Sequence, residues 1–205
     1  YAAPQPLGEV MVGGTVRAVV ESRNPRFPEG DTVVGMGGWQ EFSRVDAAGL
    51  AQLRRVDTAQ VPLAAYLGPV GMPGVTAWYG LSKILEPRPG ETGVVSAAAG
   101  AVGSVVGQLA KARGCRVVGI DIDDWKLEAA RRAGIDFVSA LGAPLLTATV
   151  FELTAGLGVD AVIITAATGG NEPLLLAPRI IRDRGRVVLV GTARLDFPRE
   201  PYYRK

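Results

Sequence analysis

Residues 91–120, ETGVVSAAAGAVGSVVGQLAKARGCRVVGI, contain the pattern that decides the fold of this chain. Thr92 to Ser96 is a short apolar run that predicts a strand, and a turn containing Gly100 and Gly103 follows it. Apolar side chains then recur at helical spacing, and a second apolar run ends just before Asp121. The stretch therefore predicts a strand–helix–strand unit of a parallel sheet.

The turn of this unit carries most of a dinucleotide-binding fingerprint. Ala98 occupies the place of the first glycine, and Gly100 and Gly103 occupy the second and third. Asp121 lies roughly 20 residues beyond the turn, where an acid accepts hydrogen bonds from ribose hydroxyls. Two simpler readings stay open: glycines that serve only helix–strand packing, and an Asp121 that caps the next helix.

Composition excludes several classes of protein. The chain has 205 residues with 48% hydrophobic content, and its net charge of +2 is too small and scattered to predict nucleic-acid binding. No apolar run approaches the ~20 residues of a membrane span, so no membrane partner is expected. Cys115 is the single cysteine, and we interpret it as a buried apolar residue in a reducing, cytoplasmic protein.

The sequence contains no histidine. A catalytic zinc ion needs three protein ligands, which one cysteine and scattered acids do not readily supply, so no zinc or other metal is expected. A Ser–His–Asp triad is excluded for the same reason.

The chain divides into three predicted parts. Residues 1–70 predict a partial β domain, 71–90 a hinge and linking helix, and 91–205 a C-terminally incomplete dinucleotide-binding domain. Within them we expect strands over 31–36, 39–45, 92–96, 116–120, 137–138, 161–164 and 185–191, and helices over 63–85 (broken at 71–74), 102–113, 124–132, 144–156 and after Asn171. Pro178 falls inside the last helix, where it should remove a hydrogen bond and kink the axis.

At this point the chain resembles a known family, the zinc-independent medium-chain dehydrogenases/reductases. The resemblance over residues 1–119 is carried by LGEVMVGG (7–14), the Gly38-Trp39-Gln40 turn, GMPGVTAWYGL (71–81) and SAAAGAVGSVVGQLAKARGCRVVG (96–119), and is closest to prostaglandin, alkenal and curcumin reductases. Residues 120–205 look more like the NAD-dependent alcohol and polyol dehydrogenase branch. The fold implied is α/β: a Rossmann-type doubly wound parallel sheet preceded by part of a GroES-like β domain.

The resemblance also implies an activity and partners. Such enzymes reduce the C=C bond of α,β-unsaturated ketones and aldehydes with a nicotinamide cofactor and no zinc, and the full-length form is expected to be a homodimer. A whole member would begin earlier and continue further, so the chain, which opens with Tyr1, is expected to be a fragment. Three alternatives stay open: a zinc-free quinone reductase, a non-catalytic nucleotide-binding scaffold, and an inactive hybrid.

Site residues carry over from the family position by position. The cofactor-binding positions are Thr76, Gly100, Ala101, Val102, Gly103, Asp121, Lys126, Thr165, Ala166, Val190, Gly191 and Thr192. Because Asp121 would repel a 2′-phosphate, NAD is favoured over NADP, although Lys126 would partly offset that repulsion. Gln40 and Tyr79 are candidate substrate residues, but a surface turn residue and a packed helix aromatic explain them equally well. No proton donor is identified.

Overall fold

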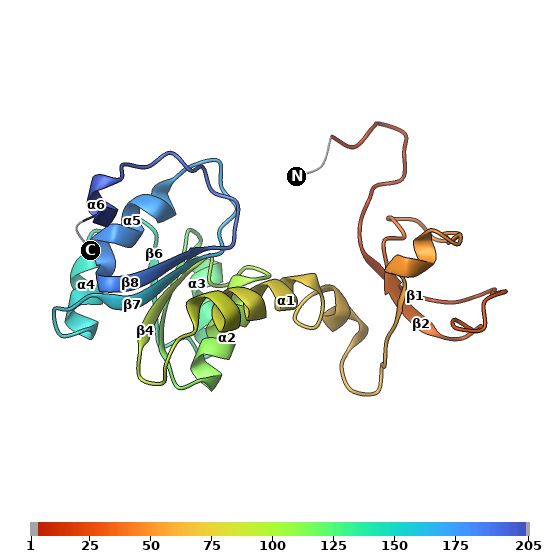
Figure 1. Cartoon of the computed structure of the whole chain (residues 1–205), viewed down its shortest axis with the longest axis horizontal. Helices are drawn as coiled ribbons and strands as arrows, with labels where there is room; N and C mark the ends of the chain where they lie inside the picture. The colour runs from red at the N-terminus through yellow and green to blue at the C-terminus, as the bar shows by residue number, and fades with distance from the viewer. Residues whose placement is uncertain (1–3, 204–205) are drawn as a thin grey trace. The chain divides into compact units, whose positions relative to one another are not determined.

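The computed structural model describes residues 4–203 and shows two compact units, which meet along the chain at Met72 and Pro73 (Figure 1). The elements of the first unit are β1 (Thr15–Ala18), β2 (Thr32–Gly35), the 3-10 helix η1 (Gly49–Gln52), β3 (Arg54–Arg55) and the 3-10 helix η2 (Leu63–Leu67). Those that follow are α1 (Met72–Tyr79), the π-helical η3 (Gly80–Leu85), β4 (Thr92–Ser96), α2 (Gly103–Ala112), β5 (Arg116–Asp121), α3 (Asp124–Arg132), β6 (Phe137–Ala140), α4 (Leu146–Leu153), β7 (Val159–Ile164), α5 (Glu172–Ile180), β8 (Ile181–Leu189) and α6 (Glu200–Tyr203).

The first unit is a small antiparallel sheet in the order β1-β2-β3. The strand predicted over 39–45 is wrong, because these residues form no regular element. The N–H groups of Gly38 and Trp39 donate to the carbonyls of Gly13 and Met11, and the chain then turns away. Gly38 adopts a φ of +69°, a left-handed conformation that ends strand geometry at this point.

The second unit is built on a parallel sheet of five strands in the order β6-β5-β4-β7-β8. The chain runs outward from β4 through β5 to β6, and then returns to the other side of β4 for β7 and β8. The direction of winding therefore reverses between β4 and β7, which makes the carboxyl ends of these two strands a topological switch point. The predicted α/β class, with a doubly wound sheet, is confirmed.

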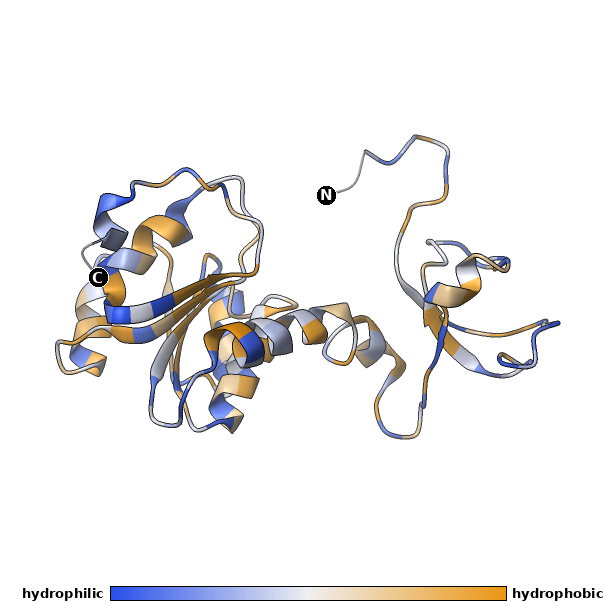
Figure 2. Ribbon diagram, viewed as in Figure 1, coloured by the Kyte–Doolittle hydropathy of each residue, from blue (hydrophilic) through white to orange (hydrophobic). Residues whose placement is uncertain are grey.

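Each face of the sheet has its own hydrophobic core. One buries side chains of η3, α2 and α3 against residues such as Val95 and Val117, and the other buries α4 and α5 against Val94 and Val118. Neighbouring residues of one strand thus enter opposite cores, as the pleat requires. Figure 2 shows the sheet mainly in hydrophobic colours, except at the start of β8, where the charged run from Arg182 lies.

The helical region over 63–85 is interrupted earlier than predicted. The chain turns at Gly68–Gly71, and Pro73 and Gly74 lie inside α1. Proline is tolerated there because the N–H groups of a first helical turn have no partner within the helix. A side chain at Gly71 would collide with the Tyr66 carbonyl oxygen, so the glycine is needed at the turn itself.

Pro178 does not break α5, which continues to Ile180 and leads directly into β8, four residues before the predicted strand start. Its missing N–H leaves the Leu174 carbonyl without the usual helical donor. The Tyr202 hydroxyl donates to that carbonyl at 2.5 Å, so α6 supplies the hydrogen bond that proline removes. Burial raises the pKa of Tyr202 to about 12, which keeps this donor protonated at neutral pH.

Candidate dinucleotide-binding site

The glycine turn lies between the end of β4 and the start of α2, at the switch point of the sheet. Within the turn, the N–H of Gly100 donates to the Ala97 carbonyl at 2.8 Å, and the N–H of Ala98 donates to the Ile120 carbonyl at 3.2 Å. Across the described part of the chain, the N–H groups of residues 101–103 donate to no protein acceptor. These three consecutive donors at a helix N-terminus form the arrangement that binds a diphosphate.

Gly103 is fixed by close packing rather than by an unusual backbone angle. A side chain there would collide with the Ala97 carbonyl oxygen and lie 2.8 Å from the Thr165 hydroxyl oxygen. The absence of a Cβ lets α2 begin directly against the ends of β4 and β7. The same contacts fit both the helix–strand packing reading and the dinucleotide reading of the sequence, and the unpaired amides favour the second.

Ser96, which is not among the predicted site residues, connects the two strands at this edge. Its side-chain oxygen accepts from the N–H groups of Thr165 at 3.1 Å and Ala166 at 3.3 Å. In return, the Thr165 hydroxyl donates to the Ser96 carbonyl at 2.5 Å. The available signal was a hydroxyl residue at the end of an otherwise apolar strand.

The other predicted cofactor residues of this edge lie beside one another. Val190 and Gly191 both donate their N–H groups to the Ile164 carbonyl at 2.9 Å, and the Thr168 N–H donates to the Thr192 carbonyl at 2.7 Å. The segment after β8 is thereby held against Thr165 and Ala166. Thr76 lies on α1, half-buried, and a side chain at Gly80, one turn later, would lie 2.9 Å from Val190.

Asp121 ends β5 and is 5% exposed. One carboxylate oxygen accepts from the N–H of Ala99 at 3.3 Å, and the other accepts from the N–H of Ile122 at 2.9 Å. The Lys126 ammonium lies 3.8 Å from Asp121 and 2.7 Å from Asp123. The Lys126 ammonium donates a hydrogen bond to the Asp123 carboxylate, and this bond raises the pKa of Lys126. Asp121 therefore braces the glycine turn, and its role at a ribose stays a prediction.

The two candidate substrate residues are not brought together within either unit. Gln40 belongs to the first unit, is exposed, and donates from its amide to the Gly37 carbonyl at 2.8 Å. Tyr79 belongs to the second, is 55% exposed, and meets Trp78 edge-on at 6.4 Å between ring centroids. Their role as substrate residues stays a prediction.

Residues 4–203 hold no group of three or more His, Cys, Asp or Glu side chains arranged to bind a metal. Cys115 is buried, and burial raises the pKa of its thiol, which suits a structural residue. Among the helices of these residues, none combines the length and apolar character that crossing a membrane requires.

Comparison with known proteins identifies the class. Residues 1–53 match the family model described as the N-terminal domain of oxidoreductase, and residues 101–202 match the one described as zinc-binding dehydrogenase. The chain belongs to the medium-chain dehydrogenase/reductase superfamily, as the sequence predicted.

Individual relatives indicate which branch of the superfamily the chain resembles. Prostaglandin reductase 1 of Mus musculus is 42% identical over 176 residues, covering 80% of this chain and 54% of the relative. The NADPH-dependent curcumin reductase of Escherichia coli is 49% identical over 120 residues, covering 58% of this chain and 34% of the relative. The chain spans about half the length of the mouse relative, and that match extends past residue 119.

A solved structure gives the same result. CurA from Vibrio vulnificus, in complex with NADPH, superposes with a TM-score of 0.77 at 32% identity, covering 100% of this chain and 61% of that one. A nicotinamide cofactor is therefore supported for this branch. The relatives named for NADPH weigh against the NAD preference that Asp121 predicted.

Proposed function

We propose that this chain is the cofactor-binding part of a reductase that transfers hydride from a nicotinamide to the C=C bond of an α,β-unsaturated ketone or aldehyde. The observation that carries the proposal is the row of unpaired N–H groups over residues 101–103 at the switch point of the sheet. The named prostaglandin and curcumin reductases support the choice of substrate class.

The residues at this edge would bind and orient the cofactor. The amides of 101–103 would hold the diphosphate, assisted by the positive end of α2. Thr165 and Ala166 would border the adenosine side, and Val190, Gly191 and Thr192, together with Thr76, the nicotinamide side. The cofactor itself supplies the hydride, while the protein supplies orientation and excludes water from the reacting carbon.

We propose NADPH as the preferred reductant. The relatives named for NADPH support this choice. So does the Lys126 ammonium, 29% exposed, which would lie beside a 2′-phosphate if Asp121 is at the ribose. Asp121 opposes it, because its carboxylate lies within 3.8 Å of the same ammonium. We therefore expect a modest preference rather than exclusion of NADH.

A binding and turnover assay tests the proposal. NADPH or NADH is titrated into the 205-residue chain. With the full-length protein, the loss of nicotinamide absorbance is then followed with an enone, its saturated ketone, or a quinone. We expect binding of both cofactors and turnover of the enone alone. Failure to bind either cofactor would contradict the proposal. Turnover of the quinone alone favours a quinone reductase, and binding without turnover favours the scaffold.

Three further predictions belong to the whole enzyme. Independence of zinc is supported by the absence of histidine and is checked by measuring activity after dialysis against a chelator. The homodimer predicted from the resemblance is checked by light scattering of the full-length protein. The cytoplasmic location is checked by cell fractionation.

A further inference from the structure

We propose that Ser96 is a positioning residue of the cofactor site, which sets the spacing of the β4 and β7 ends and thereby the aim of the diphosphate-binding amides. This inference rests on the proposed function and adds a residue to it. Ser96 would not touch the cofactor. It would act through Thr165 and through the start of α2.

The Ser96 hydroxyl accepts two backbone hydrogen bonds at the end of β4. The side chain is almost fully buried, at 7% exposure, and the ladder between β4 and β7 ends at the pair of Ser96 and Ile164. Beyond this pair, the N–H groups of Thr165 and Ala166 both donate to the Ser96 side-chain oxygen. One hydroxyl thus serves as acceptor for two amides at the place where the sheet opens.

Thr165 connects Ser96 to the start of α2. The Thr165 hydroxyl donates back to the Ser96 carbonyl at 2.5 Å, so its oxygen is held at a fixed place. That oxygen lies only 2.8 Å from where a Cβ of Gly103 would stand, and Gly103 is the first residue of α2. Ser96, Thr165 and Gly103 therefore form one continuous line of contacts across the switch point.

The line of contacts ends at the proposed diphosphate-binding amides. Gly103 is the last of the three residues whose N–H groups have no protein acceptor in the described chain. Such donors bind a diphosphate only when they converge on it, and sites of this kind need placement within about 0.5 Å. Removing the Ser96 hydroxyl leaves two amides without an acceptor, and the ends of β4 and β7 are free to shift to find water.

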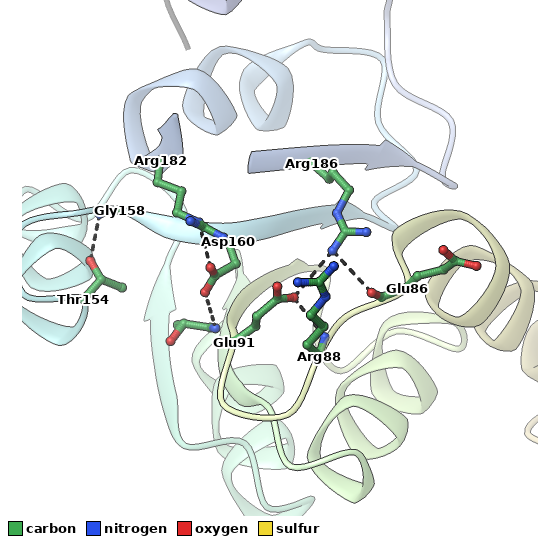
Figure 3. Close-up of polar contacts among 9 residues, drawn as sticks. Glu86, Arg88, Glu91, Thr154, Gly158, Asp160, Arg182 and Arg186 are labelled. Atoms are coloured by element: carbon green, nitrogen blue, oxygen red, sulfur yellow. Dashed lines mark hydrogen bonds and ion pairs between the residues drawn. The ribbon is translucent and has the colours of Figure 1, made fainter. Parts of the chain in front are cut away.

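Thr154 provides a matched control at the other edge of the sheet. Its hydroxyl oxygen accepts from the Gly158 N–H at 3.0 Å, just before β7 (Figure 3). The hydroxyl also donates to the Val150 carbonyl at 2.7 Å. Thr154→Ala and Ser96→Ala each remove a hydroxyl that accepts from backbone N–H groups, one at Thr154 and two at Ser96. They differ in their distance from the diphosphate-binding amides.

The test titrates NADPH and NADH into the chain and the two variants, at a temperature where circular dichroism shows all three folded. We expect Ser96→Ala to raise the Kd for both cofactors by about tenfold or more, as displacement of a binding group by a fraction of an ångström implies. Thr154→Ala is expected to lower the Tm while leaving the Kd unchanged. Amide exchange should accelerate at Thr165 and Ala166 in Ser96→Ala only.

Ser96→Cys is the second variant, should Ser96→Ala fail to fold. Sulfur is a weak acceptor, so an intermediate Kd is expected. Equal Kd values for the unaltered chain and the Ser96 variants would overturn this inference and leave the proposed function standing. A similar rise in Kd for Thr154→Ala would also overturn it, because the effect would then be general destabilisation. A chain that binds no cofactor at all contradicts the proposed function and this inference together.

Discussion

The two edges of the parallel sheet use their polar groups in different ways. At the amino edge, backbone N–H groups near the strand starts donate to carboxylates, and each of these carboxylates also pairs with a cation. Asp160 accepts from the Thr92 N–H at 2.7 Å and from Arg182 at 2.7 Å (Figure 3). Asp136 repeats the arrangement, accepting from the Val117 N–H at 2.7 Å and from Lys111 at 2.5 Å.

At the carboxyl edge, the ends of β4 and β7 are joined by neutral groups instead. Ser96 and Thr165 join β4 to β7 through hydroxyls and amides, and glycines stand where side chains would collide. Three N–H groups remain without a protein acceptor there, over residues 101–103 of the described chain. The polar groups described at the amino edge are thus satisfied within the protein, whereas the carboxyl edge keeps N–H groups that could bind a ligand. Substitutions at the two edges should therefore separate stability from cofactor binding.

The largest effect is expected from Gly103→Ala at the carboxyl edge. The added methyl group would collide with the Ala97 carbonyl oxygen and crowd the Thr165 hydroxyl, and both belong to strand ends that cannot easily move. We expect a loss of stability of about 1–3 kcal/mol, the usual cost of overpacking, together with loss of measurable cofactor binding. Urea unfolding and a cofactor titration measure the two effects.

Gly169→Ala is the matched control for this substitution. Gly169 lies in the loop after β7, and a side chain there would meet no atom within 4 Å. Its stability and cofactor Kd should stay close to those of the unaltered chain. Unchanged cofactor binding by Gly103→Ala would mean that the glycine serves packing alone.

At the amino edge, Asp160→Ala should lower stability without altering the cofactor Kd. The substitution leaves the Thr92 N–H without an acceptor, on a residue only 6% exposed, and leaves Arg182 without its partner. An unsatisfied buried donor costs about 1–3 kcal/mol. Asp160→Asn keeps an acceptor for Thr92 and should lose less. If the cofactor Kd rose with either variant, the two edges would not be independent.

Local patterns predicted the strand and the glycine turn at the carboxyl edge, but they predicted the side-chain hydrogen bonds of neither edge. The strand from Thr92 to Ser96, the glycine turn and Asp121 follow from spacing within one short stretch, because each depends on near neighbours. The bond between Asp160 and Thr92 joins residues 68 apart, and that between Thr165 and Ser96 joins residues 69 apart. No local pattern marks such pairs, since they exist only after the sheet has assembled.

Pro178 is a second case in which the sequence does not reveal a distant hydrogen-bond partner. The sequence correctly predicts that proline removes a hydrogen bond, but not that the Tyr202 hydroxyl replaces it at Leu174. The strand predicted over 39–45 was wrong because the apolar side chains there are not buried against a sheet: Trp39 is 70% exposed and Phe42 is 68% exposed. Periodicity records which side chains are apolar, and tertiary contacts decide whether they are buried.

A smaller, pH-dependent effect is expected at the amino edge from Asp136. Burial alone would raise the pKa of Asp136, but hydrogen bonds from Lys111 and the Val117 N–H outweigh it and lower the pKa below 3.8. Because the folded pKa is lowered, this stabilisation is present above the unfolded pKa and is lost as the pH falls through the folded value. Urea unfolding of the chain and of Asp136→Asn, from neutral pH to below pH 4, measures the difference. Curves that stayed parallel throughout the acid range would contradict the assignment.

The smallest effect is expected from Asp121, an acid of the carboxyl edge that resembles Asp136 and Asp160 of the amino edge. Asp121 also accepts from a backbone N–H and faces a cation, yet Lys126 is shared with Asp123 and lies beside the ribose position that we propose. Asp121→Asn keeps an acceptor oxygen for only one of the Ala99 and Ile122 N–H groups, so a modest fall in Tm is expected. Removing the negative charge should improve the Kd for NADPH relative to NADH by about fivefold, the scale of one screened charge near a phosphate. Raising the salt concentration should shrink that ratio, and a ratio unaffected by both changes would show that Asp121 only braces the glycine turn.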